Sequence, residues 1–316
     1  MRFWLGVTDN SWFNFLSTRG LDEVNFWQPS GKAPFDVSTA PSGMPFLFKL
    51  KNPHNHVAGG GFFVTYSRLP IALAWEVFGP KCGVETLDGL IDRLNRLAGR
   101  TRVTMTTEIG CTVLASPFYL PQDEWIPVGD AFRRQTVVGK FLDSERDGAA
   151  IWRGVSAALA ADKYAPADDR LIAMGASTEP REKFGNLILM KPRLGQSSFR
   201  VLVTDAYKRR CAITGENTLL ALEAAHIVPY SNERGSHDVR NGLLLRADFH
   251  RLFDAGLVSV NQDLRIKVSP KIRETWFNGK VYYKLNDQPL SVVPEIESQK
   301  PDRDLLKWHV ENRFQA

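Results

Sequence analysis

Four side chains between residues 226 and 254 have the types and spacing that metal-assisted hydrolysis requires. Asn241 follows His226 by 15 residues, and His250 follows Asn241 by 9. His250 and Asp254 are four residues apart, so on a helix both project from one face, where they can hold one divalent cation. A neutral imidazole such as His226 can take a proton from water, and a cation beside it can stabilise charge that develops on a phosphate. The set therefore predicts phosphodiester hydrolysis.

The segments around these residues suggest how they are positioned. We expect two short strands that end at His226, then a polar loop, then a helix that opens at Asn241. Gly256 comes just after the expected end of this helix, where glycine is favoured because the backbone turns left-handed there. Strand and helix would then bring His226 and His250 to one place.

These residues and intervals resemble the HNH (ββα-metal) nuclease family, and the two intervals match those of its colicin-type members. The resemblance implies that His226 is the general base, that Asn241 tethers the loop carrying it, and that His250 binds the metal. It also implies that Asp254 is a further metal ligand and that Glu223, three residues before the base, is a carboxylate that supports the site.

One position departs from the family pattern. Ala225 stands where relatives often have an Asp or His ligand, so phosphate and water would complete the shell around a single divalent ion. Mg²⁺ is the first candidate for that ion, with Mn²⁺, Ni²⁺ and Zn²⁺ as alternatives. The three cysteines, Cys82, Cys111 and Cys211, are far apart and form no CxxC pair, so any metal is left to His, Asp, Glu or Asn.

The segment KPRLGQSSFRVLVTDAYKRR, residues 191–210, resembles the one that precedes the HNH motif in many restriction-type nucleases. Its pattern predicts an amphipathic helix whose exposed face carries basic side chains that could bind phosphates. Residues 191–316 hold 20 Lys and Arg against 15 Asp and Glu, whereas residues 1–190 hold 20 of each. The surplus suits a polyanionic partner, although a solvated charged face would look the same. The candidate DNA contacts are Arg193, Gln196, Arg200, Lys208, Arg209, Arg210 and Arg251.

The whole chain predicts an α+β fold with two domains, because 316 residues exceed the usual size of one core. We expect a DNA-reading domain at 1–140, a helix and linker at 141–184, and an HNH endonuclease domain at 185–316. The linker is rich in Pro, Gly and charge. Beyond the motif, 258–269 and 279–285 are expected to pair as strands.

The N-terminal part resembles the PUA-like group that includes EVE and SRA modules, on the strings FWLGVT, VNFWQPSG, SGMPFLFKL and VAGGGFFVTY. The resemblance implies a β-barrel-type α/β domain that binds nucleic acid and holds a flipped, modified base between aromatic rings. Gly59, Gly60 and Gly61 would allow a close backbone approach, or would simply form a bulge. The aromatic rings could instead be core residues. The candidate pocket residues are Asp9, Asn10, Trp12, Asn25, Phe26, Trp27 and Gln28.

Together these features predict a modification-dependent restriction endonuclease that reads a modified cytosine in double-stranded DNA. One HNH site nicks one strand, so a double-strand cut predicts a homodimer. A restriction endonuclease that recognises unmodified sequence, or a DNA-binding protein with a non-catalytic HNH scaffold, are the alternatives. The sequence has no apolar run of about 18 residues, which predicts no membrane span, and no signal-peptide pattern, which predicts a cytoplasmic location.

Overall fold

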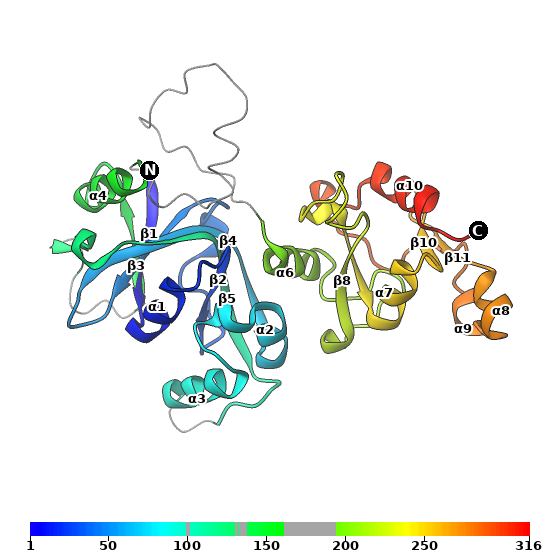
Figure 1. The fold of residues 1–316 in the computed structure, drawn as a ribbon, viewed down its shortest axis with the longest axis horizontal. Helices are drawn as coiled ribbons and strands as arrows, with labels where there is room; N and C mark the ends of the chain where they lie inside the picture. Colours follow the sequence, from blue (N-terminus) through cyan, green and yellow to red (C-terminus); the bar gives the residue numbers. More distant parts are fainter. Residues whose placement is uncertain (99–101, 130–131, 133–137, 161–193) are drawn as a thin grey trace, which may run out of the picture. The chain divides into compact units, whose positions relative to one another are not determined.

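The computed structural model describes residues 1–98, 102–129, 132, 138–160 and 194–316. The fold is a mixture of helices and strands, as the sequence predicts. The chain divides into two compact units, Met1–Arg193 and Leu194–Ala316 (Figure 1). Over the described residues, no helix is both long and apolar enough to cross a membrane.

A mixed β-sheet forms the centre of the first unit. Its strand order is β2-β5-β4-β3-β1-β7, and β6 pairs with β4. β1 and β3 run parallel, and every other pair is antiparallel. In the described part of the chain β2 and β7 do not pair with each other, so no ladder closes this sheet into a barrel. The strands are β1 (Arg2–Thr8), β2 (Glu23–Gln28), β3 (Pro45–Leu50), β4 (His56–Pro70), β5 (Glu108–Tyr119), β6 (Ile126–Pro127) and β7 (Gly139–Asp143).

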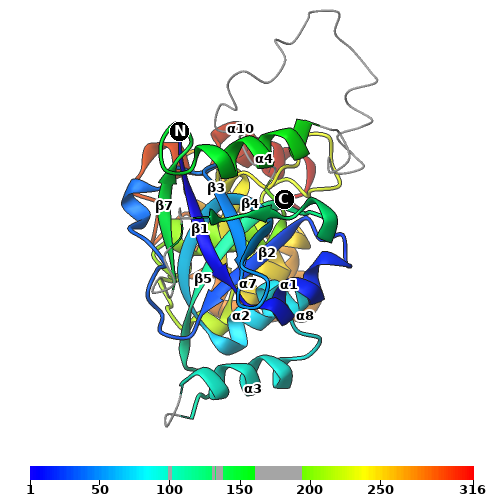
Figure 2. The same ribbon diagram turned by 90° about the vertical axis from the view of Figure 1, so that its left-hand side faces the viewer.

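Helices cover both faces of this sheet because its strands are apolar on both sides. In β1, Trp4 joins a buried aromatic cluster with Trp12 of α1, whereas Phe3 and Leu5 pack with Ile151 of α4. Successive strand residues point to opposite faces, so α1 and α4 lie on opposite sides of the sheet, as Figures 1 and 2 show. The helices of this unit are α1 (Asn10–Ser17), α2 (Ile71–Phe78), α3 (Leu87–Ala98) and α4 (Ala149–Ala160).

The glycine run that the resemblance links to base binding lies inside the β-sheet. Gly59 and Gly60 lie within β4, where a Cβ atom on Gly59 would come 2.3 Å from the Phe118 carbonyl oxygen. The register of β4 against β5 shifts between Gly60 and Phe62. These glycines therefore allow neighbouring strands to approach and the sheet to bulge, the second of the two readings.

The region after residue 140 belongs to the first unit as far as it is described. β7 extends to Asp143 and pairs with β1, and α4 packs on the sheet through Ile151 and Val155. The sequence assigns this helix to a segment between the domains, whereas its apolar face is buried against Phe3 and Leu5. The rest of the expected linker, 161–184, lies outside the described residues.

The second unit is built around a β-hairpin held by helices on one apolar core. Phe199 and Val203 of α6 and Phe249 and Phe253 of α7 pack with the buried leucines of β9. The elements are α6 (Gln196–Ala206), β8 (Leu222–His226), β9 (Gly242–Arg246), α7 (Ala247–Asp254), β10 (Val258–Val260), β11 (Ile266–Val268), α8 (Lys271–Trp276), α9 (Lys280–Tyr283) and α10 (Arg303–Asn312).

Two sequence expectations for this unit are wrong. Asn241 does not open a helix: it ends a 3₁₀ turn, and β9 follows it and pairs with β8 before α7 begins at Ala247. A short apolar run such as GLLLR suits either a strand or a buried helix, and here its leucines are buried in the pairing. In addition, β10 pairs with β11, while 280–283 is the helix α9 rather than a strand.

Candidate active site

The side chain of Asn241 holds together the two ends of the loop between β8 and β9. Its side chain is fully buried. Its Oδ1 accepts a hydrogen bond from the Val228 amide, and its Nδ2 donates to the carbonyl oxygens of Val228 and Ser236, each at 2.9 Å. One side chain therefore binds both the start and the end of the loop that follows His226. This is the tethering geometry that the resemblance implies for Asn241.

His226 ends β8 with its ring enclosed on two sides. The ring stacks on Phe199 of α6, with centroids 3.9 Å apart, and its Nε2 lies 3.1 Å from Nδ1 of His237. Burial, together with the nearby imidazoles of His237 and His250, lowers the pKa of His226 to about 4. The imidazole is therefore neutral near pH 7, which is the form that can accept a proton.

His237, in the polar loop between β8 and β9, is a site residue that the motif and its spacing do not single out. In the structure it bonds to His226, and its ring stacks on Tyr230 with centroids 4.0 Å apart. No periodic pattern marks it, because its position depends on how Asn241 folds the loop. A second imidazole next to the candidate base can orient that base or exchange a proton with it.

His250 lies on α7 between two carboxylates. Its Nδ1 is 2.6 Å from Oε2 of Glu223 on β8, and its Nε2 is 3.4 Å from Oδ2 of Asp254, one turn further along the helix. If Nδ1 donates to Glu223, the lone pair of His250 is on Nε2, directed to the side where Asp254 lies. The three predicted residues thus come together, with Glu223 positioned to orient the imidazole.

The donor set fits a divalent ion that takes two protein ligands. Two atoms that each bind a metal at about 2.1 Å are separated by about 3.0–3.4 Å, which suits His250 Nε2 and Asp254 Oδ2. Ala225 is fully buried in the core and supplies nothing. Within the described ranges no cluster of three or more His, Cys, Asp or Glu side chains is arranged to hold a metal. Water and phosphate would therefore complete the shell.

The predicted basic helix face is only partly right. α6 ends at Ala206, so Lys208, Arg209 and Arg210 lie beyond it, and Lys208 and Arg209 adopt left-handed backbone conformations. Lys208 pairs with Glu295, Arg209 pairs with Asp205 at 3.8 Å, and Arg210 donates to the Gly215 carbonyl.

The other candidate DNA contacts have different surroundings. Gln196 and Arg251 are exposed, and Arg200 is half-buried on α6. Arg193 lies outside the described residues. Any role of these side chains in binding DNA stays a prediction.

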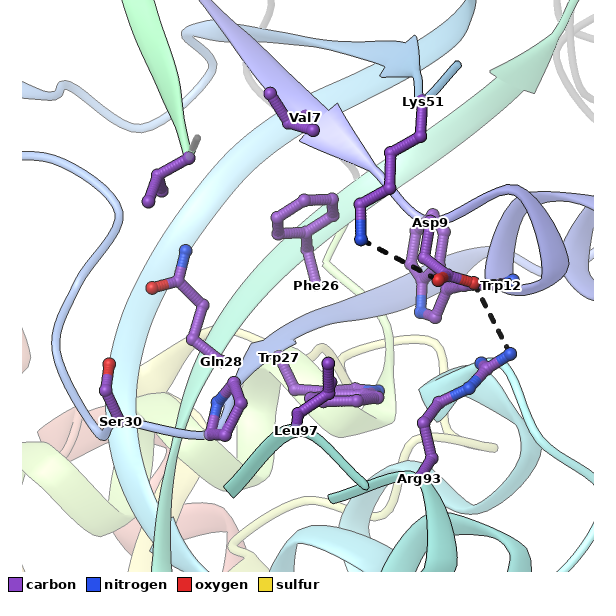
Figure 3. A pocket seen from close by; sticks show the side chains of 12 residues that line it. Val7, Asp9, Trp12, Phe26, Trp27, Gln28, Ser30, Lys51, Arg93 and Leu97 are labelled. Carbon is purple, nitrogen blue, oxygen red and sulfur yellow. Dashed lines mark hydrogen bonds and ion pairs between the residues drawn. The ribbon is translucent and has the colours of Figure 1, made fainter. Parts of the chain in front are cut away.

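A pocket of about 260 Å³ opens in the first unit where the sequence predicts a base-binding site. Five of the seven predicted residues line it (Figure 3): Asp9, Trp12, Phe26, Trp27 and Gln28. The side chain of Gln28 makes no hydrogen bond within the described part of the chain, so its amide is free to donate and accept. Both aromatic surface and an unused amide therefore face the pocket.

The two remaining pocket candidates are elsewhere. Asn25 is buried on β2, and its Nδ2 lies within hydrogen-bonding distance of the sulfur atoms of Cys82 and Cys111. It alternates with Phe26 along the strand and points to the other face. Asn10 does not line the pocket either, because its Oδ1 accepts from the Lys51 amide.

Two cations that the sequence did not single out stand on one side of the pocket. Asp9 lies 3.8 Å from Lys51 and 3.4 Å from Arg93 of α3 (Figure 3). Burial opposes the charge of Asp9, but hydrogen bonds from Ser11 and the Trp12 amide, together with the two cations, outweigh it and lower the pKa of its carboxyl. Asp9 is thus an ionised N-cap of α1, anchored by its own helix.

Comparison with known proteins identifies the class of the second unit. Residues 211–261 match the HNH endonuclease family, and this stretch holds β8, β9 and α7 with all five predicted site residues of the motif. The chain carries an HNH endonuclease domain and is a nuclease that hydrolyses phosphodiester bonds.

Two solved structures are similar to the chain at low identity. ASCH from Zymomonas mobilis is 9% identical, with a TM-score of 0.32, over 46% of this chain and 92% of that one. A structure described as the modification dependent TagI restriction endonuclease is 13% identical, with a TM-score of 0.26, over 91% of this chain and 74% of that one. Neither score establishes a common fold. The comparison with curated proteins finds no match.

Proposed function

We propose that this protein is a modification-dependent restriction endonuclease. Its first unit would bind a flipped, modified cytosine of double-stranded DNA, and its second unit would cut the DNA. The observation that carries the proposal is the joint presence of an HNH site and, in a separate unit, a small pocket with aromatic walls. An endonuclease needs no such pocket for hydrolysis, and a first unit that reads the DNA would account for it.

In the cutting step, His226 takes a proton from the attacking water. Its neutral imidazole is held between Phe199 and His237, and Asn241 fixes the loop behind it. His250 and Asp254 would hold one divalent ion, with Mg²⁺ the first candidate. When bound there, such an ion would supply positive charge to stabilise the charge that develops on the phosphate and the leaving oxygen. Glu223 holds the His250 ring in place through Nδ1.

Substitution of His226 tests the cutting step. We expect His226→Ala to lose cleavage by about 10²–10⁴-fold or more, because a positioned base contributes that much, while DNA binding is retained. His54→Ala, a change at a histidine of the other unit, is the matched control and should cut normally. Cleavage by His226→Ala at the normal rate would show that another group is the base.

In the reading step, the pocket would hold a single flipped base. Its volume, about 260 Å³, is just below the ~300 Å³ at which pockets for drug-sized ligands begin, so it suits one ring with a small substituent. Trp27, which is half-buried, offers aromatic surface to replace the stacking that a flipped base loses, at about 1–3 kcal/mol per base, whereas Phe26 belongs to the buried aromatic core and is only 9% exposed. The Gln28 amide can pair with the donor and acceptor edge of a pyrimidine.

A panel of DNA duplexes that differ only in cytosine modification tests the reading step. We expect cleavage in the presence of Mg²⁺ only when one particular modification is present. Trp27→Ala and Gln28→Ala should lower cleavage of that duplex without altering the HNH site. Equal cleavage of modified and unmodified duplexes would instead support a restriction endonuclease that recognises unmodified sequence.

A double-strand cut requires two HNH sites, because each site hydrolyses one strand. We therefore propose that two copies of the chain act together on DNA. Sedimentation of the protein with and without its DNA tests this, and a monomer on cleaved duplex would contradict it.

A further inference from the structure

The α8–α9 hairpin, residues 271–284, presents large aromatic side chains to solvent. Phe277 is 90% exposed and Trp276 is 58% exposed. Among the large apolar residues that the structure describes, Phe277 is the most exposed. Phe277 also has a φ of 53°, a left-handed conformation that glycine usually occupies at the end of a helix. A bulky residue held there carries a conformational cost, and such strain gathers at functional sites.

The same hairpin carries four basic residues and one acidic residue. Lys271, Arg273, Lys280 and Lys284 are exposed, and over the described residues none of them forms an ion pair with a carboxylate. Arg273, Lys280 and Lys284 line a hollow of about 660 Å³ together with Phe277 and Tyr283. The hairpin therefore combines unpaired positive charge with exposed rings, the combination that nucleic-acid surfaces use.

The frame that presents these side chains is anchored. Ile272 is buried in the core of the second unit. The Tyr283 hydroxyl lies 2.9 Å from the Ser269 carbonyl oxygen, to which it donates, and accepts from the Arg273 amide at 3.0 Å. These contacts hold α8 against α9, so Phe277 projects from a fixed turn.

The hairpin is attached to the helix that carries the candidate metal ligand. The Tyr282 ring of α9 meets the Phe249 ring edge to face, with centroids 5.4 Å apart, and Phe249 directly precedes His250 on α7. A DNA duplex with its cleaved phosphate at His250 therefore lies on α7, and α7 is in direct contact with the hairpin.

We propose that the α8–α9 hairpin is a second DNA contact of this nuclease. Phe277 and Trp276 pack their rings against sugars and base edges in the groove beside the cleaved phosphate, and Arg273, Lys280 and Lys284 bind backbone phosphates. The hairpin thereby helps to hold the duplex on the HNH site whatever base the other unit reads. The inference rests on the nuclease activity alone and not on the reading of a modified base.

The test uses the full chain carrying His226→Ala, which prevents cleavage, and an unmodified 40-base-pair duplex. Binding is followed by fluorescence anisotropy over a range of salt concentrations. The double variant Trp276→Ala/Phe277→Ala should bind at least about 5-fold more weakly, because it loses apolar contact area, and its salt dependence should be unchanged, because it loses no charge. The plot of log K against log salt has a negative slope, and Lys280→Gln/Lys284→Gln should make it shallower by about 1.8, since each lost phosphate contact accounts for about 0.9.

Matched controls are Ile296→Ala, an exposed apolar residue of the same unit, and Lys307→Gln, an exposed lysine of α10. Both should leave affinity and slope unchanged. An affinity within 2-fold in the aromatic variant, together with an unchanged slope in the lysine variant, would overturn the proposal. Binding of the chain to phosphatidylserine vesicles that is lost in the aromatic variant, with DNA affinity intact, would overturn it in favour of a membrane contact.

Discussion

Replacing Asn241 by aspartate tests whether this side chain holds the loop that follows His226. The carboxylate keeps the size of the amide and can still accept from the Val228 amide. It cannot donate, so the carbonyl oxygens of Val228 and Ser236, now 2.9 Å from Nδ2, would face a buried negative charge. The change therefore removes two donated hydrogen bonds and puts a buried negative charge in their place, with little change in side-chain size.

The expected cost follows from these two contacts. A buried polar group left without its partner costs about 1–3 kcal/mol, so two such carbonyls give a loss of about 2–6 kcal/mol in the stability of the loop at neutral pH. Burial of the new carboxyl would raise its pKa above that of the unfolded chain. The loss should then shrink as the pH falls, because the protonated acid can donate one of the two bonds again.

Hydrogen exchange followed by mass spectrometry measures the loss locally, in peptides that span 227–241 of the full chain. Asn232→Asp is the matched control: it makes the same change in the same loop, where Oδ1 only accepts from the Arg234 amide and a carboxylate serves equally well. We expect faster exchange and weaker cleavage in Asn241→Asp and neither effect in the control. Protection of the loop within about 0.5 kcal/mol of the parent protein would refute the tethering role.

Three further predictions concern other parts of the structure. Burial lowers the pKa of His309 to about 4, so as the pH falls the unfolded chain takes up a proton before the folded chain does. The free energy of unfolding should therefore drop by up to about 3 kcal/mol between about pH 6.5 and 4. His309→Gln should reduce that drop, as measured by urea titrations at several pH values. Glu223→Gln should weaken Mn²⁺ binding about 10–100-fold in calorimetry, because the carboxylate orients His250, whereas Glu233→Gln in the exposed loop should not; equal affinities would contradict the role of Glu223. Gly59→Ala should lower the Tm, since the added Cβ would lie 2.3 Å from the Phe118 carbonyl oxygen. Gly89→Ala on α3 is the control: its Cβ would have no neighbour closer than 3.4 Å, so the Tm should stay equal or rise. An unchanged Tm in Gly59→Ala would show that β5 can shift to make room.

Local patterns explain which parts of the HNH unit could be predicted. His250 and Asp254 lie one turn apart on α7, and Gly256 has a φ of 70° just after it, as spacing and residue type indicate. The choice between strand and helix at GLLLR could not be made from the sequence, because three leucines in a row fit both. Pairing with β8, an interaction across the loop, decided it.

In the first unit, too, local patterns account for some features and contacts between distant segments account for others. The resemblance implies a base pocket on β2, and Phe26, Trp27 and Gln28 do line one. Asn25 does not, because its side chain is buried against the sulfur atoms of Cys82 and Cys111, which come from distant segments. Arg93 and Lys51 come from segments far along the chain, and no local pattern connects them to Asp9. The bulge at Gly59 and Gly60 likewise depends on β5, which follows about 50 residues later.

By itself the sequence determined the residue types of the HNH site, their spacing, and the helical face that joins His250 to Asp254. Those relations lie within one turn or one strand, where backbone geometry alone sets which side chains are neighbours. The tertiary structure decided that His237 bonds to His226, that Glu223 meets His250 across 27 residues, and that Phe277 projects from an anchored hairpin. Such contacts depend on the path that burial of the apolar core imposes on the loops, and that path is not written in any short pattern.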